Sequence, residues 1–226
     1  MIVEEALEIE GLTRRAFTAG GIASVALLAG CQTTTTAFGP PAFGTRRYHA
    51  LAYAAKKDEK FPLPAIDIES FDQRYLRRRV DYKTKERPGT VVVEPHNRFL
   101  YLVEPNGKAI RYGVGVGRAG FQWSGRARIG HKRAWPTWTP PAAMIRRRPE
   151  LAKWARGMPP GLKNPLGARA LYLYQGGRDT LYRLHGTDSP KSIGGANSSG
   201  CVRMWNQDII DLYDRVKIGA RVIVKA

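Results

Sequence analysis

Cysteine is scarce in this sequence, and its scarcity limits the chemistry available. The 226 residues contain two cysteines, Cys31 and Cys201, so there is no Cys-x-x-Cys pair and no cysteine-rich zinc framework. The four histidines are scattered along the chain without the spacing of metal ligands. We therefore expect no metal site and no cofactor.

Acidic residues are also few. The 19 Asp and Glu residues face 37 Lys and Arg residues, which gives a formal net charge of +18. A basic surface favours polyanions such as nucleic acid, anionic lipid, lipopolysaccharide phosphates or the carboxylates of cell-wall peptides. A solvated surface with no single partner is the simplest interpretation. We expect no nucleic-acid partner, because the basic residues are spread without a recognisable binding module.

A long hydrophobic run is missing as well. The weakly apolar stretch at residues 17–30 is shorter than the roughly 20 residues that a transmembrane helix needs, but it suits the core of a signal peptide. It follows Thr-Arg-Arg-Ala-Phe at 13–17, which resembles a twin-arginine export motif. We therefore expect residues 1–30 to be an export signal and the protein to be periplasmic. A short buried helix is the alternative interpretation.

The same stretch ends in Leu-Ala-Gly-Cys at 28–31, which is similar to a bacterial lipobox. Cys31 is therefore a candidate lipid attachment site, and a lipid there would tether the protein to a membrane. Signal cleavage further along, near residues 33–42, would leave no lipid.

The remaining chain divides into two parts by composition. Residues 31–87 are predicted to be a linker and an extension without its own chemistry, in which the run Arg77-Arg78-Arg79 is expected to be solvated. Residues 88–226 form the second part, with short strands separated by turn signals such as Pro-Asn-Gly at 105–107 and Gly-Gly at 176–177.

The fold class follows from the second part. Many short strands with few helices predict a mainly β domain, a sandwich or barrel-like architecture. One helix is predicted over 207–216, with Asn206 as its N-cap. Residues 118–167, rich in Trp and Pro, are expected to form a long irregular insertion. The insertion is either a lid or groove wall, or simply a region stiffened by aromatic packing.

A candidate active site combines a thiol with an imidazole. Cys201 follows Ser-Ser-Gly, where a turn of small residues leaves backbone N–H groups, such as that of Gly200, free to bind an oxyanion. His185 ends an apolar run 16 positions earlier. A thiol is nucleophilic as thiolate, so it needs a base or a positive field beside it. This combination is typical of a cysteine acyltransferase.

These residues carry a resemblance to a known family. His-Gly-Thr at 185–187, a Gly-rich loop, and Ser-x-Gly-Cys-Val-Arg-Met at 198–204 resemble the signature of the L,D-transpeptidase catalytic domain of the YkuD type. The similarity extends over about residues 88 to 226. Many members have Ser-His-Gly-Cys, whereas this chain has Ser199 in the position of that histidine.

The resemblance implies roles for several residues. It makes Cys201 the nucleophile and His185 the general acid and base, with the backbone of Gly186 orienting His185 and the backbone of Gly200 in the oxyanion hole. It implies a β fold and peptidoglycan stem peptides as partners, with a second stem, an anchored outer-membrane protein or lipoprotein, or a D-amino acid as acceptor. The planar guanidinium of Arg203 suits a substrate carboxylate, and Ser199 is a further candidate for substrate binding.

Other interpretations of these residues stay open. Arg203 could instead form a structural ion pair with Asp208 or Asp211, and Ser199 could simply make the turn. A secreted cysteine carboxypeptidase would use the same residues but transfer the acyl group to water. A non-catalytic wall-binding module is the third possibility, favoured by the basic charge and by Ser199.

Overall fold

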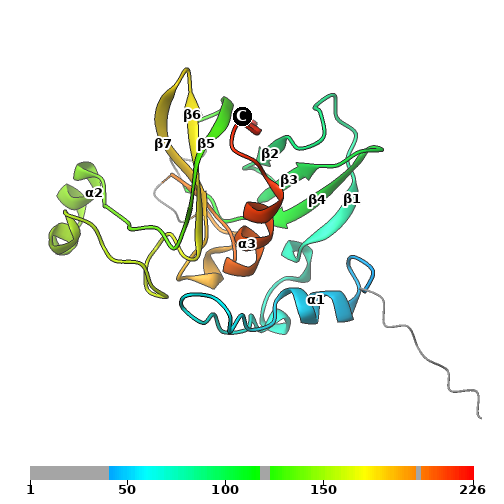
Figure 1. Ribbon diagram of the computed structural model, residues 1–226, viewed down its shortest axis with the longest axis horizontal. Helices are drawn as coiled ribbons and strands as arrows, with labels where there is room; N and C mark the ends of the chain where they lie inside the picture. The colour runs from blue at the N-terminus through cyan, green and yellow to red at the C-terminus, as the bar shows by residue number, and fades with distance from the viewer. Residues whose placement is uncertain (1–40, 118–122, 197–199) are drawn as a thin grey trace, which may run out of the picture. The chain divides into compact units, whose positions relative to one another are not determined.

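A computed structural model describes residues 41–117, 123–196 and 200–226 (Figure 1). The predicted export signal, Cys31 and Ser199 lie outside the described residues. Within the described part, no helix is long and apolar enough to cross a membrane.

The described strands form a single nine-stranded sheet in the order β1-β4-β3-β2-β9-β5-β6-β7-β8. Most neighbours are antiparallel, while β2 with β9 and β7 with β8 are parallel. The strands are β1 Arg78–Asp81, β2 Val91–Glu94, β3 Phe99–Val103, β4 Lys108–Gly113, β5 Gly125–Ala134, β6 Arg169–Gln175, β7 Arg178–His185, β8 Val202–Arg203 and β9 Arg221–Val224. The helices are α1 Arg46–Ala52, α2 Ala142–Arg147 and α3 Asn206–Arg215, with 3₁₀ turns at Ile68–Ser70, Gln73–Tyr75, Pro149–Trp154 and Pro190–Ser192.

The two ends of this sheet approach each other. Gly115, just after β4, exchanges two backbone hydrogen bonds with Arg203 in β8, at 2.9 and 2.7 Å. Because β4 lies next to one edge of the strand order and β8 forms the other edge, the sheet curls on itself. The expectation of a mainly β, barrel-like domain is confirmed.

Tight turns at the expected positions produce the hairpins. Asn106 and Gly107 have φ of 59° and 67° between β3 and β4, and Gly176 and Gly177 have φ of 56° and 78° between β6 and β7. Two successive residues with positive φ match the twist of antiparallel strands, and glycine or asparagine adopts them at low cost.

Helix α3 covers the main hydrophobic core, and Figure 1 shows it crossing in front of the strands. Its Ile209 and Leu212 are fully buried against residues from most strands of the sheet. The members of this core include Val91, Val93, Leu100, Ile110, Tyr112, Ile129, Leu171, Leu173, Leu184, Val202 and Val222.

The structure corrects the expectation for residues 118–167, because they contain the ten-residue strand β5. In β5, Ala127 and Ile129 are buried while Arg126 and Arg128 are exposed, the alternation of a strand with one face on the core. This region also contains two short helices, α2 and the 3₁₀ helix Pro149–Trp154, which are separated near Pro149.

The extension before residue 88 is built into the same sheet. Strand β1 pairs with β4, and Tyr53, Tyr75 and Leu76 form a second hydrophobic cluster with Ile193 and Trp205. Ile193 precedes the candidate nucleophile and Trp205 follows it. The extension therefore supports both sides of the Cys201 loop instead of merely lying along the domain.

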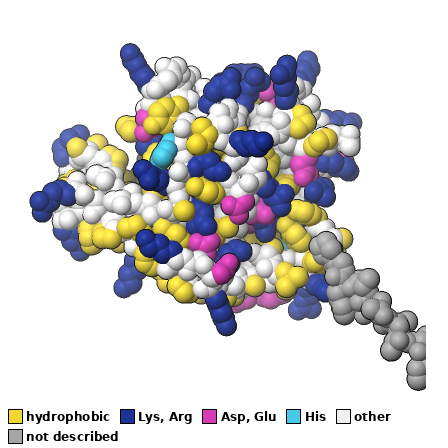
Figure 2. All heavy atoms as spheres, in the orientation of Figure 1, with side chains coloured by type: hydrophobic (Ala, Val, Ile, Leu, Met, Phe, Trp, Pro, Cys, Tyr) yellow, Lys and Arg dark blue, Asp and Glu magenta, His cyan; other side chains and the backbone are white. Residues whose placement is uncertain are grey.

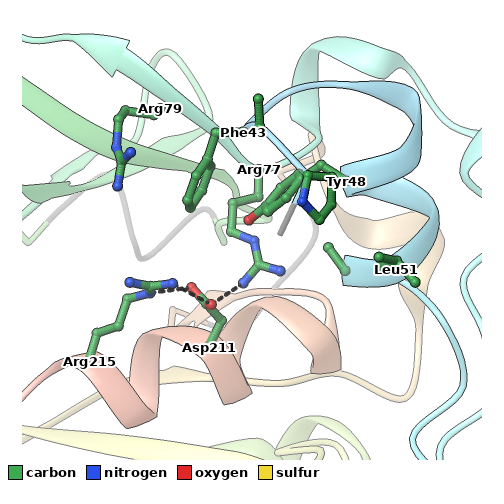
Figure 3. Close-up of a pocket in the computed structure, with 10 residues that line it drawn as sticks. Phe43, Tyr48, Leu51, Arg77, Arg79, Asp211 and Arg215 are labelled. Atoms are coloured by element: carbon green, nitrogen blue, oxygen red, sulfur yellow. Dashed lines mark hydrogen bonds and ion pairs between the residues drawn. The ribbon is translucent and has the colours of Figure 1, made fainter. Parts of the chain in front are cut away.

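Arg77 also corrects an expectation, because it is 4% exposed and not solvated. Its Nη1 lies 2.6 Å from a carboxylate oxygen of Asp211 (Figure 3). Its Nε lies 3.7 Å from Asp208, also in α3. Tyr53 donates to Asp208 at 3.1 Å and accepts from the Arg77 N–H at 2.7 Å. Arg215 pairs with Asp211. This network binds the extension to α3.

The pKa values of two carboxyl groups in this network shift in opposite directions. Burial raises the pKa of Asp208 to about 7, although the charge of Arg77 opposes the shift. Burial also acts to raise the pKa of Asp211, but hydrogen bonds from Arg215 and the charge of Arg77 outweigh it and lower that pKa. The folded state therefore favours a protonated Asp208 and an ionised Asp211.

We expect Asp208→Asn and Asp211→Asn to change stability with opposite pH dependence. A folded pKa above the unfolded value makes stability fall as pH rises, here between about pH 4 and pH 7 and by at most about 1.4 kcal/mol per pH unit. Asp208→Asn should remove that fall, so its melting temperature relative to the wild type should rise across this window.

Asp211 contributes stability above its unfolded pKa, and that contribution is lost on acidification. Asp211→Asn should therefore become more destabilising, relative to the wild type, as pH rises through about 4. Thermal melts from about pH 2.5 to 8 measure both effects, because the change at Asp211 falls below its unfolded pKa. Parallel pH profiles for the two variants would contradict this assignment.

Basic side chains cover the visible face without forming one patch. Figure 2 shows Lys and Arg side chains on every part of that face, interspersed with apolar side chains and a few acidic ones. The pattern agrees with a solvated basic surface.

Candidate active site

Parallel pairing of β7 with β8 brings the imidazole and the thiol together. Leu184 pairs with Val202 and His185 pairs with Arg203. Continuing this register by one residue places Cys201 beside Arg183, and a backbone hydrogen bond at Arg183 acts on the thiol. His185 and Cys201 are therefore diagonal neighbours on adjacent strands, although they are 16 positions apart in sequence.

The two side chains lie on the same face of the sheet. Leu184 and Val202 point into the main core. Because side chains alternate along a strand, His185, Cys201 and Arg203 belong to the opposite face. Three of the residues selected from the sequence thus occupy one site.

Cys201 is partly buried, and its thiol has a backbone carbonyl oxygen on one side. Its Sγ lies 3.8 Å from the carbonyl oxygen of Leu181. Burial raises the pKa of Cys201, while the backbone at Arg183 and the guanidinium charges of Arg183 and Arg203 oppose that rise. The positive field therefore keeps a thiolate accessible but does not hold the resting thiol ionised.

A kink in β7 creates this contact. Leu181 has φ of 63°, which is unusual for a residue with a Cβ, and its side chain is 73% exposed. Its N–H is held at 2.8 Å by Asp179, which also pairs with Arg183. The kink turns the Leu181 carbonyl toward the sulfur. Sequence analysis did not identify Leu181, because an exposed leucine within a strand gives no pattern.

An aromatic pair packs against the main core at β7. The rings of Trp123 and Tyr182 stack with centroids 4.9 Å apart, and burial raises the pKa of Tyr182, with a further contribution from the charge of Cys201. Trp123 comes from the predicted insertion, so one residue of that insertion packs against the main core. Trp135 packs in a separate cluster with Leu63 and Ile210. This is the aromatic packing that was the second interpretation of the insertion.

The imidazole of His185 is buried and oriented by the backbone. Its Nδ1 lies 2.6 Å from the carbonyl oxygen of Gly186. A carbonyl only accepts, so Nδ1 carries the proton and the lone pair is on Nε2. This is the contact that the family resemblance implies for Gly186. Burial lowers the pKa of His185 to about 4, against hydrogen bonds with the backbone of Gly186 and Pro165.

The two pKa shifts together define the resting state. At neutral pH the imidazole is neutral and the thiol is protonated. A neutral imidazole with its lone pair on Nε2 can accept the thiol proton as the sulfur attacks a carbonyl. The arrangement therefore suits general-base catalysis better than a standing thiolate–imidazolium pair.

Glycines shape the loop that presents Cys201. Gly200 is buried and has φ of 135°, a conformation that other residues rarely adopt. At Gly115, a Cβ would lie 2.3 Å from the carbonyl oxygen of Ser192, so only glycine allows this strand to approach the loop. The role of Gly200 in an oxyanion hole, which the resemblance implies, stays a prediction.

Arg203 is half-buried beside the thiol. Burial lowers its pKa, which the charges of Asp188 and Cys201 oppose. The suggested ion pair with Asp208 or Asp211 is wrong, because both carboxylates face Arg77 instead. Its guanidinium thus remains a candidate for substrate binding.

Asn206 does not cap α3 as expected. Trp205 occupies the cap position, and the Asn206 amide bonds to the backbone of Ala168 and Thr187, both at 2.9 Å. The helix begins at Asn206 with an acidic residue, Asp208, in its first turn, but that carboxyl group serves the network with Arg77.

No other described feature competes as a reaction centre. In the described part of the chain, no three His, Cys, Asp or Glu side chains cluster in a way that could hold a metal. A hollow of about 490 Å³ lies between α1, β1 and α3, lined by residues such as Phe43, Tyr48, Leu51 and Arg77 (Figure 3). Neither Cys201 nor His185 lines it.

The curled β-sheet thus carries a thiol and an imidazole on the same face, at the pairing of β7 with β8. The family model of the YkuD L,D-transpeptidase catalytic domain matches residues 88–224, more than half of the chain. The chain belongs to this family, as the sequence motifs implied.

Individual relatives agree with this assignment. The chain is 35% identical over 139 residues to the probable L,D-transpeptidase YbiS of Escherichia coli strain K12, covering 59% of this chain and 43% of that protein. The match to the probable L,D-transpeptidase ErfK/SrfK of the same strain is also 35% identical, over 141 residues. The similarity therefore spans less than half the length of these curated relatives.

A solved structure from Brucella melitensis, described as a probable carnitine operon oxidoreductase caia, is 46% identical to this chain. It aligns with 70% of this chain and 99% of its own, with a TM-score of 0.49. That description refers to the Brucella melitensis protein and not to this chain.

Proposed function

We propose that this protein is a peptidoglycan L,D-transpeptidase that uses Cys201 as nucleophile and His185 as general acid and base. The observation that supports this most directly is the pairing of β7 with β8, which places both side chains on one face beside Arg203. Family membership supplies the reaction class.

In the proposed acylation, the Cys201 sulfur attacks the carbonyl carbon of the third residue of a tetrapeptide stem while Nε2 of His185 takes the thiol proton. The tetrahedral oxyanion is stabilised by backbone N–H groups at Gly200 and Cys201. The C–N bond to the terminal D-alanine breaks, His185 protonates the leaving amine, and a thioester remains.

In the proposed transfer, an acceptor amine attacks the thioester and His185 takes its proton. The C–S bond breaks, and the thiol is regenerated as a new amide forms. A diaminopimelate side chain on a second stem would give a 3→3 cross-link, and an anchored lipoprotein or a D-amino acid would give the other products. Arg203 supports donor binding through a stem carboxylate, and Ser199 is proposed as a second contact.

The proposed location follows from the residues outside the described part. An exported protein acting in the periplasm would meet its substrate there, and a lipid on Cys31 would hold it at a membrane surface. The twin-arginine-like and lipobox-like motifs support this proposal.

Purified protein incubated with tetrapeptide muropeptides tests the reaction. We expect free D-alanine together with cross-linked dimers, resolved by chromatography and mass spectrometry. Free D-alanine with tripeptides alone would identify a carboxypeptidase that transfers to water. Absence of D-alanine release would favour a non-catalytic wall-binding module.

A further inference from the structure

The side chain of Asn206 links the loop before β6 to the loop after β7, which begins next to His185. Its Oδ1 accepts a hydrogen bond from the Ala168 N–H and its Nδ2 donates to the Thr187 carbonyl, each at 2.9 Å. The N–H partner can only donate and the carbonyl can only accept, so the orientation of the amide is fixed. The side chain thus satisfies one group from the loop before β6 and one from the loop after β7.

Two glycines allow the backbone to approach this amide. A Cβ on Gly167 or on Gly186 would lie 2.2 Å from Asn206 Oδ1. Gly167 also has φ of 61°, which favours glycine. The amide is therefore enclosed by the backbone of both loops, and a larger side chain at either glycine would displace it.

The bonded backbone is the one that orients His185. The carbonyl of Gly186 accepts from Nδ1 of His185 at 2.6 Å, and Asn206 holds the next carbonyl, that of Thr187. The His185 carbonyl is held in turn by the Met204 N–H at 2.8 Å. The Gly186 N–H is held separately by the Arg169 carbonyl at 3.0 Å. The Asn206 bond therefore restrains the chain on the other side of this flexible glycine, and without it the Gly186 carbonyl that accepts from Nδ1 would be less firmly held.

We propose that Asn206 is a positioning residue, which fixes the Gly186–Thr187 backbone so that His185 keeps its Nδ1–H tautomer and presents Nε2 to Cys201. Helix capping does not account for the side chain, because the first helical N–H groups bond to the Trp205 carbonyl. The catalytic consequence rests on the proposed function, whereas the effect on the imidazole does not.

Asn206→Asp is the sharpest variant. It keeps the shape of the side chain and the acceptor for Ala168, and a carboxylate near a helix start is favourable for stability. It removes the donor to the Thr187 carbonyl. A carboxylate oxygen then faces the Thr187 carbonyl oxygen, and the two repel. Gln207→Ala is the matched control, because Gln207 also donates to a backbone carbonyl from α3, that of Pro64 at 2.9 Å, but in the extension.

The first readout is the imidazole, followed by ¹⁵N–¹H NMR of histidine-labelled full-length protein. We expect a slowly exchanging Nδ1–H signal of His185 in the wild type and in Gln207→Ala, and its loss or shift in Asn206→Asp and Asn206→Ala. An unchanged signal in both Asn206 variants would overturn the proposal, whether or not the protein is a transpeptidase.

The second readout is D-alanine release as a function of pH. We expect a fall in kcat/KM of about 10²-fold for Asn206→Asp, the scale of a small misplacement of a catalytic group. The acidic limb of the pH profile reports the pKa of His185. It should move from near pH 4 toward about 6.5, because a loosened imidazole becomes hydrated. Asn206→Asp activity within twofold of the wild type, or an unmoved acidic limb, would overturn the proposal.

Discussion

Replacing Cys201 with alanine should reduce D-alanine release from tetrapeptide stems to the uncatalysed background, a loss on the order of 10⁴-fold or more. The reason is that the proposed thioester cannot form without the sulfur, and His185 alone has no nucleophile to activate. The fold should survive, because Cys201 is only partly buried and its replacement leaves the β7–β8 pairing intact. D-alanine release and a thermal melt measure the two outcomes.

Cys31→Ala supplies the matched control, because it removes the other cysteine in the chain. Its D-alanine release in detergent-free buffer should equal that of the wild type. A Cys201→Ala protein that retains release would contradict the enzyme assignment, and loss of activity in Cys31→Ala alone would move the nucleophile to the other cysteine.

Deleting all residues before position 88, where the family match begins, should abolish folding. The truncation removes β1 and exposes Trp205, which Tyr53 and Leu76 otherwise cover. Burying each such side chain contributes about 1.5–3 kcal/mol. Loss of Arg77 also removes the cation that pairs with Asp208 and Asp211 in α3. These losses together reach the typical total stability of about 5–15 kcal/mol.

The comparison protein begins at Pro41 and keeps every described element. It should show a cooperative melt, whereas the protein beginning at residue 88 should lack one and be insoluble or bind a hydrophobic dye. A shorter protein that melts cooperatively and releases D-alanine would show that the family domain is independent of the extension.

Local signals predicted much of the fold. The Pro-Asn-Gly and Gly-Gly turns specify hairpins through backbone conformations that few residues adopt, so β3–β4 and β6–β7 were predictable. Strand β5 was not predicted, because arginines dominate its exposed face and few β-branched residues support it. Its alternation of Arg126, Ala127, Arg128 and Ile129 was nevertheless a usable signal.

Long-range contacts explain the remaining errors. Arg77 lies in a run of three arginines, and only its carboxylate partners in α3, more than 130 positions away, make it buried. Asn206 has the composition of an N-cap, but the backbone of Thr187 and Ala168 uses its amide instead. Neither partner can be found from local sequence.

The site was predictable in its residues but not in its electrostatics. The motifs selected Cys201 and His185, and the topology places them on one face. The kink at Leu181 and the stacking of Trp123 on Tyr182 depend on strand pairing, so no sequence pattern marked them. The low pKa of His185, about 4, results from burial that only the folded chain creates.

Mass spectrometry of the intact protein, taken within seconds of mixing with a tetrapeptide stem, tests the central claim most directly. A covalent adduct with the mass of the donor less D-alanine should appear on the peptide that contains Cys201, and its formation should slow strongly in His185→Ala. Release of D-alanine with no adduct on the protein, or an adduct on a residue other than Cys201, would contradict the account.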